Sequence, residues 1–381
     1  MILQSSNFKS KILETHGAGI KEIEELSVYN QNLFNTVSLS PSLTFPLQPE
    51  PHIPLWQEYL NSASKIGAWS TLKNVLVQLN FPIQEGISQT DFYRAATLRG
   101  KNPQTIIEAS GLVLQQPEKL GLKLHTSLGG TVPILLPNNR EDFEALVRAL
   151  TKRNEPQTIP ASMGACTIAG YNNWDRIRRY RQQWSRENPD RCSEVDWQQE
   201  FKKIIPQKSL YQDCFIILSN GFYSDVSAQE VNLNQSQWQE FSLTIRLEHE
   251  CTHYFTRRLF NSMQNNLLDE LIADYQGIRA VLGYYRADWF LRFMGLESFP
   301  DYRVGGRLQN YRGIPPLSDR AFEVLQSLVV KAANNLEQID RLYAEKLKLR
   351  QNQFLMLIAL VNLSLEELAS DLDSSRLNEV W

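Results

Sequence analysis

The chain of 381 residues is 42% hydrophobic and 21% charged, which is the composition of a globular protein with one large domain or two smaller ones. Its net charge of −3 is too small to favour an anionic partner such as nucleic acid or a charged membrane surface. Long disordered segments are not expected at this hydrophobic content. We therefore predict a folded protein that recognises its partners through local groups of residues.

The first 150 residues are expected to form a mostly helical N-terminal domain with one short hairpin. Helical periodicity runs through residues 7–33, with an interruption at Gly17–Gly19. It continues in pieces over residues 55–120, after a proline-rich connector. Two apolar runs on either side of Gly129 and Gly130 indicate the hairpin, and residues 139–154 have the pattern of an amphipathic helix.

The next helix, beginning near Asn173, is rich in arginine. Arginines from Arg176 to Arg186 alternate with aromatic residues, a pattern that could bind an anion such as nucleic acid. We favour a solvated helix face whose aromatic residues dock on the protein, and we expect no nucleic-acid partner. Further along, residues 213–218 form a continuous apolar run, which predicts a strand.

From Ser236 onward the pattern predicts a layer of helices. The expected helices lie at residues 236–262, 266–282, 318–348 and 351–373. The longest apolar run of this layer, Phe354 to Leu363, has about half of the roughly 20 residues that a membrane-spanning helix requires.

The cysteines and the N-terminus indicate the cellular compartment. Cys166, Cys192, Cys214 and Cys251 are widely spaced and form no C-x-x-C pair, which fits reduced thiols better than disulfides or a zinc ribbon. The N-terminus has no apolar signal core behind a basic start. We therefore expect a cytoplasmic protein without a membrane span.

Residues 247–256, LEHECTHYFT, contain the pattern H-E-x-x-H at His249, Glu250 and His253. On a helix, residues four apart lie on one face, so both imidazoles could reach one metal ion at about 2.0–2.1 Å. Glu250 lies beside them and could take a proton from a water activated by the metal. The alternative is a buried helix whose histidines are hydrogen-bonded by neighbouring residues, and a third ligand would favour the metal.

That third ligand must be sought among the carboxylates, because His253 is the last histidine of the chain. Thr256 and Leu259 stand where a metzincin would have glycine and histidine, which excludes that family. In the later segment DELIAD, Glu270 and Asp274 are four apart and share one face of a predicted helix.

The combination of H-E-x-x-H with a later E-x-x-x-D resembles the gluzincins, the thermolysin-like zinc metallopeptidases, over about residues 247–282. The resemblance implies Zn²⁺ as the cofactor and Glu270 as its third ligand. It also implies that Asp274 hydrogen-bonds a ligating histidine, His249 in our interpretation, and fixes its tautomer. Only 16 residues separate His253 from Glu270, fewer than is usual in this group, which leaves Asp269 and Asp274 as alternative ligands.

Many gluzincins stabilise the tetrahedral oxyanion with a further histidine, which this chain lacks after His253. A tyrosine or an arginine would have to take that role. The loop at residues 301–313, DYRVGGRLQNYRG, offers Tyr302, Arg307, Tyr311 and Arg312 as oxyanion or substrate contacts. The alternative is an ordinary connector between helices with solvated arginines.

Together these patterns predict a helix-rich α+β protein, with a mixed N-terminal domain at residues 1–150 and a zincin-like domain with a small sheet and a helical layer at residues 151–381. The expected function is that of a zinc-dependent hydrolase, most directly a metallopeptidase that cleaves a peptide or protein substrate with Glu250 as general base. The alternative is a metal-stabilised or catalytically degenerate interaction or regulatory protein, in which a fourth protein ligand closes the site.

Overall fold

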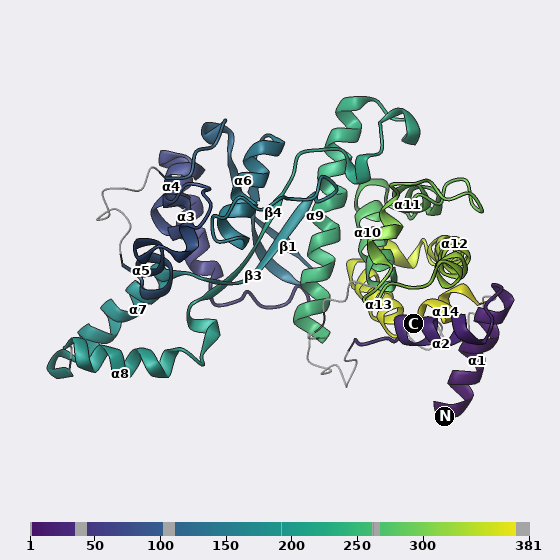
Figure 1. The fold of residues 1–381 in the computed structure, drawn as a ribbon, viewed down its shortest axis with the longest axis horizontal. Helices are drawn as coiled ribbons and strands as arrows, with labels where there is room; N and C mark the ends of the chain where they lie inside the picture. Colours follow the sequence, from purple (N-terminus) through teal and green to yellow (C-terminus); the bar gives the residue numbers. More distant parts are fainter. Residues whose placement is uncertain are drawn as a thin grey trace. The chain divides into compact units, whose positions relative to one another are not determined.

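A computed structural model of the chain describes residues 2–34, 44–101, 111–191, 193–260, 262 and 267–370. The chain divides into two compact units (Figure 1). Unit 1 consists of Met1–Leu47, Ser127–Gly129 and Phe222–Trp381, and unit 2 consists of Gln48–Thr126 and Gly130–Gly221. The predicted fold class is confirmed, since the described residues are helix-rich and include a small mixed sheet. The domain boundary at residue 150 stays a prediction.

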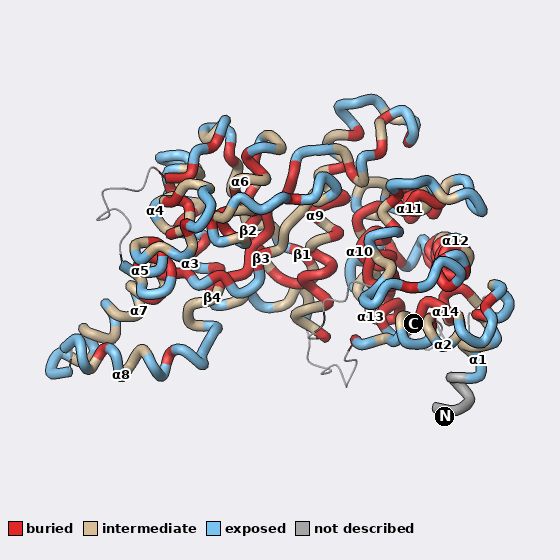
Figure 2. Tube along the Cα trace, viewed as in Figure 1, coloured by how far each residue is buried: buried red, intermediate tan, exposed pale blue. Residues whose placement is uncertain are grey.

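Unit 2 is built on a four-stranded sheet with the order β1-β2-β4-β3. The strands are β1 (Gly121–Ser127), β2 (Gly130–Leu136), β3 (Ala165–Asn172) and β4 (Gln212–Leu218). β1 and β2 form the predicted hairpin, β2 pairs in parallel with β4, and β3 pairs with β4 antiparallel. β4, the strand predicted at residues 213–218, is buried along almost its whole length (Figure 2).

Helices share a hydrophobic core with this sheet, because its apolar side chains need a second layer. They are α3 (Ile53–Ile66), α4 (Ala68–Val75) and α6 (Arg140–Thr151). A separate hydrophobic cluster joins α5 (Asp91–Arg99), α7 (Trp174–Glu187) and α8 (Glu194–Ile204). Trp56 of α3 and Phe143 of α6 are completely buried and share a core with Phe215 of β4. The predicted amphipathic helix at 139–154 is α6, and Asn139 caps its first turn.

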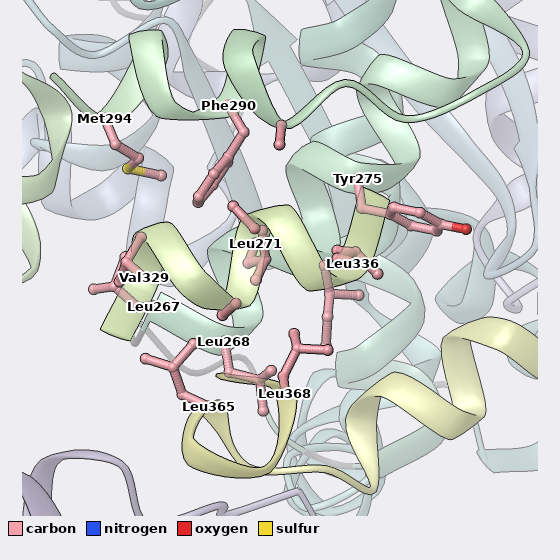
Figure 3. Close-up of a cluster of buried hydrophobic side chains, with 14 of the residues drawn as sticks. Leu267, Leu268, Leu271, Tyr275, Phe290, Met294, Val329, Leu336, Leu365 and Leu368 are labelled. Atoms are coloured by element: carbon pink, nitrogen blue, oxygen red, sulfur yellow. The ribbon is translucent and has the colours of Figure 1, made fainter. Parts of the chain in front are cut away.

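Unit 1 is a set of helices around one large hydrophobic core. The helices are α1 (Ile2–Thr15), α2 (Ile20–Tyr29), α9 (Gln235–Phe260), α10 (Leu267–Leu282), α11 (Ala287–Met294), α12 (Asp319–Leu342), α13 (Arg350–Val361) and α14 (Leu365–Ala369). Figure 3 shows Leu271 of α10, Phe290 of α11 and Leu336 of α12 within this core. The N-terminal helices thus belong with the C-terminal layer, although some 200 residues lie between them.

The helix predictions for this layer need three corrections. The helix predicted at 318–348 ends earlier, because α12 stops at Leu342 and a short 3₁₀ helix, Lys346–Lys348, follows it. The stretch predicted as one helix at 351–373 is two helices in its described part, because Ser364 caps the start of α14 through a capping box with Glu367. The structure also contains α11, which was not predicted, before the loop at 301–313. No helix of the described residues has both the length and the hydropathy of a membrane span.

The described cysteines are not joined to one another. Cys166, Cys214 and Cys251 form no disulfide, and Cys192 lies outside the described residues.

α9 and α10 pack closely against each other, and one glycine permits this contact. A Cβ atom at Gly277 of α10 would lie 2.8 Å from the backbone oxygen of Ile245 and 3.0 Å from its Cγ2. A larger residue at this point would therefore push the two helices apart. This contact brings α9, which carries H-E-x-x-H, against α10, which carries the later carboxylates.

Candidate metal centre

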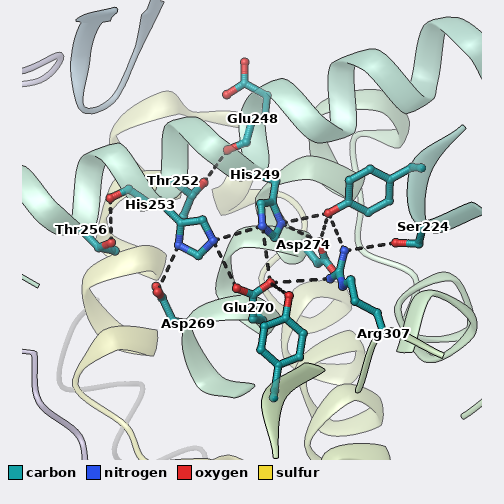
Figure 4. A network of polar contacts seen from close by, with 12 residues as sticks. Ser224, Glu248, His249, Thr252, His253, Thr256, Asp269, Glu270, Asp274 and Arg307 are labelled. Atoms are coloured by element: carbon teal, nitrogen blue, oxygen red, sulfur yellow. Dashed lines mark hydrogen bonds and ion pairs between the residues drawn. The ribbon is translucent and has the colours of Figure 1, made fainter. Parts of the chain in front are cut away.

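His249 and His253 lie one turn apart on the buried face of α9. The helix forms as predicted, with Leu247, Cys251 and Phe255 buried at four-residue intervals on its apolar flank. The Nε2 atoms of the two histidines are 3.1 Å apart (Figure 4). Both side chains are almost fully buried, so their ring nitrogens need partners within the protein.

Glu270 of α10 faces both histidines. Its Oε2 lies 3.5 Å from Nε2 of His249, and its Oε1 lies 3.5 Å from Nε2 of His253. Four ligands at about 2.0–2.1 Å in a tetrahedron are separated by about 3.3–3.4 Å, close to these three spacings. The side chains form a group whose ligand atoms lie within 4.8 Å of one another, so His249, His253 and Glu270 could hold a metal ion.

Each histidine has an aspartate on its other nitrogen. Nδ1 of His249 is 2.7 Å from Oδ1 of Asp274, and Nδ1 of His253 is 3.1 Å from Oδ2 of Asp269. A proton held on Nδ1 leaves the Nε2 lone pair free to bind a cation. Asp269 and Asp274 therefore lie behind the imidazoles, and Glu270 is the carboxylate that faces both Nε2 atoms.

Asp274 is the centre of a buried polar network. Tyr223 donates a hydrogen bond of 2.5 Å to Oδ1 of Asp274, and Arg307 forms an ion pair with Oδ2. Arg307 also donates to the Tyr223 hydroxyl at 2.9 Å and to Oγ of Ser224 at 3.1 Å (Figure 4). Ser224 and Asp225 hold left-handed backbone angles, with φ of 53° and 56°, which non-glycine residues adopt at a cost. This strained turn brings Tyr223 to Asp274.

The four loop residues named from the sequence have different positions. Arg307 reaches Asp274, and Tyr311 donates a hydrogen bond of 2.8 Å to Oε2 of Glu270. The other two have partners in and after the loop: Tyr302 with the backbone of Gly306 and Gln309, and Arg312 with Leu317 and Asp319. The loop therefore brings two of the four candidates to the histidines and carboxylates.

The charges of the centre shift the pKa values of its members. Burial acts to raise the pKa of Glu270, but the two histidines and Arg307 outweigh it and hold that pKa well below its usual range. Burial also opposes the charged form of Asp274, whose pKa is nevertheless lowered by Arg307 and His249. Burial and the charge of Glu270 raise the pKa of Tyr311, which keeps its hydroxyl protonated as a donor. Glu270 and Asp274 are thus held ionised, as metal binding requires of a ligand, whereas burial raises the pKa of Asp269.

Glu250 lies on α9 beside His249 and is half-buried. The Glu248 carboxylate, two residues earlier, points away from the histidines and Glu270 in Figure 4.

A protein-family model described as a family of unknown function (DUF7005) matches residues 11–372. The chain belongs to this family. No curated protein and no solved structure matches the chain. The resemblance to gluzincins therefore rests on the residues between 247 and 282, together with the geometry of His249, His253 and Glu270 in this family member.

Tyr223 is a member of the centre that no sequence motif indicates. It follows the end of a strand and belongs to no spaced motif, so only the folded chain brings it to Asp274, which is 51 residues later. Asp269, one of the alternative ligands predicted from the sequence, pairs with Nδ1 of His253.

The arginine-rich helix α7 belongs to unit 2, and several of its arginines have acidic partners. Arg176 pairs with Asp213 at 2.9 Å and Arg179 pairs with Glu58 at 2.7 Å. Arg181 pairs with Glu194 and lies over the ring of Trp197. These contacts favour a helix face that is neutralised within the protein over a binding surface for polyanions.

Proposed function

We propose that this chain is a zinc-dependent hydrolase and, most directly, a metallopeptidase acting on a cytoplasmic peptide or protein substrate. The proposal is supported by the arrangement of five residues, of which three face one point and two lie behind the histidines. His249, His253 and Glu270 converge, while Asp269 and Asp274 are taken up by the Nδ1 atoms behind the histidines. Three protein ligands leave a position for water or substrate, which is the difference between a catalytic and a structural zinc site.

A zinc ion held here would act as a Lewis acid and lower the pKa of water towards neutrality. The chain's own residues would supply the proton transfers. Glu250 is next to His249 on α9 and only half-buried, so it could accept a proton from the attacking water and later pass it to the leaving amine. Its role in the proposal is that of general base and then general acid.

Tyr311 is our candidate for stabilising negative charge that develops on the substrate carbonyl. Its hydroxyl donates its one proton to Glu270 Oε2 at 2.8 Å, next to the proposed ligand atoms, and would turn this proton from Glu270 to the carbonyl oxygen as the negative charge develops. Arg307 is bound to Asp274 and Tyr223, so we assign it to holding the centre together. Tyr302 and Arg312 are assigned no part in the chemistry, because their hydrogen-bond partners belong to the loop and to the beginning of α12.

The test compares hydrolysis of a quenched fluorescent peptide library by the zinc-loaded wild type, Glu250→Gln and Glu248→Gln. Glu250→Gln should bind zinc as the wild type does and lose turnover by about 100-fold or more, since general base catalysis contributes about 10²–10⁴-fold. Glu248→Gln is the matched control and should retain wild-type turnover, because its carboxylate points away from the centre. Full activity in Glu250→Gln would refute the assignment.

A second candidate function is favoured by the burial of the centre. The exposed fractions of His249, His253 and Glu270 are 7%, 6% and 4%, which would suit a metal that stabilises an interaction or regulatory protein. In that case zinc removal would lower the unfolding temperature of the wild type, while the zinc-loaded chain would cleave no peptide of the library.

A further inference from the structure

α2, near the N-terminus, reaches the loop that serves the metal centre. Tyr29, the last residue of α2, donates a hydrogen bond of 2.5 Å to the backbone oxygen of Tyr311. Its ring also lies beside Gly313, where an added Cβ would be 3.2 Å from Cδ2 of Tyr29. Gly313 has a φ of +84°, so this close turn suits glycine. Tyr29 therefore contacts the loop through both its hydroxyl and its ring.

The hydroxyl of Tyr311 continues this connection into the centre. It donates a hydrogen bond of 2.8 Å to Oε2 of Glu270, the carboxylate that faces both histidines. The backbone of Tyr311 is thus held by Tyr29, and the side chain of Tyr311 holds Glu270. Burial and the charge of Glu270 raise the pKa of Tyr29, so its hydroxyl stays protonated and able to donate.

A second contact fixes the same helix to the beginning of α12. The carboxylate of Glu25 accepts hydrogen bonds from the backbone nitrogen of Ser318 at 2.8 Å and from its hydroxyl at 2.9 Å. Ser318 is the N-cap residue of α12. α2 therefore holds the chain on both sides of residues 312–317, and only the Tyr29 contact leads on to Glu270.

We propose that Tyr29 is a positioning residue of the metal centre, which sets the place of the Tyr311 hydroxyl and through it the orientation of the Glu270 carboxylate. This inference rests on the proposed function, because it needs zinc to bind at Glu270. It makes α2, some 240 residues before Glu270 in the chain, a part of the site.

The experiment measures zinc affinity by chelator competition in the full-length chain, using Tyr29→Phe, Tyr311→Phe and the double variant. Tyr311→Phe should weaken zinc binding by about 10-fold or more, the effect of removing a partner of a metal ligand. Tyr29→Phe should weaken it by roughly 2- to 12-fold, the affinity equivalent of one hydrogen bond. The double variant should bind zinc as Tyr311→Phe does, since Tyr29 acts through Tyr311.

Glu25→Gln is the matched control on the same helix. It weakens the contact with Ser318 and should lower the unfolding temperature of the zinc-free chain without changing zinc affinity. Tyr29→Phe keeps the ring against Gly313, so the variant should retain the packing of α2. The unfolding temperature of the zinc-free variant measures whether this packing is kept.

The outcomes separate the two proposals. Wild-type zinc affinity in Tyr29→Phe would overturn the positioning role, and so would fully additive losses in the double variant. An equal loss of zinc affinity in Glu25→Gln would also overturn it, because the effect would then come from docking of α2 as a whole. A wild-type chain that binds no zinc would refute the proposed function itself.

Discussion

Replacing Asp274 with asparagine should have two measurable effects of different origin. The Asp274 side chain is completely buried and is paired with Arg307, whose side chain is 15% exposed. Asparagine keeps the volume but removes the charge, and breaking a buried ion pair from one side costs about 3–5 kcal/mol of folding stability. Zinc binding should weaken by about 10- to 100-fold, because His249 loses the carboxylate that polarises its imidazole.

The assay combines urea unfolding of the zinc-free chain with chelator competition for zinc. Asp274→Asn combined with Arg307→Met removes both charges, so it should recover most of the lost stability, since a buried pair can be replaced by uncharged groups at little cost. Zinc affinity should stay weak in the double variant, because the histidine still lacks its carboxylate. A single variant with nearly wild-type stability, or a double variant as unstable as the single one, would refute this reasoning.

Two further predictions concern stability. Gly277→Ala should destabilise the chain by about 1–3 kcal/mol in urea unfolding, because its Cβ would meet Ile245 between α9 and α10, and an unchanged midpoint would contradict the close packing. Burial raises the pKa of Glu366, even though Asn30 donates a hydrogen bond to its carboxylate. The folded chain therefore keeps this proton at pH values where the unfolded chain has lost it, and the free energy of unfolding falls as the pH rises through that interval. Glu366→Gln should remove this pH dependence without loss of stability at pH 7, and a less stable variant at pH 7 would show that the charge is favourable.

The part of the site that could be predicted from sequence is the part that depends on local geometry. His249 and His253 are one turn apart on any helix, and so are Glu270 and Asp274. The apolar positions around them were enough to predict both helices within two residues of their ends. His249, His253 and Glu270 therefore come together because α9 and α10 pack against each other.

The supporting contacts could not be predicted, because they join residues far apart in the sequence. Tyr223 reaches Asp274 through a strained turn, and Tyr29 reaches Tyr311 across 282 positions. Neither tyrosine has a spacing or a periodicity that distinguishes it from other aromatic residues of the chain. Which of the loop candidates would face the centre was equally undetermined, since glycines at 305 and 306 allow many loop conformations.

The short break between α13 and α14 shows the same limit at the level of secondary structure. The apolar periodicity continues through residues 351–373, so it predicts one helix. The capping box of Ser364 and Glu367 supplies an alternative set of hydrogen bonds and starts a new helix there. A local cap overrides the longer pattern in this case.

Metal analysis of the purified protein would show whether His249, His253 and Glu270 bind zinc, without any assay of activity. Wild type, His253→Ala and Glu270→Ala would be purified side by side without added chelator and their metal content measured by mass spectrometry. We expect close to stoichiometric zinc in the wild type and a large loss in both variants. Equal zinc contents in all three proteins would refute the proposed metal site.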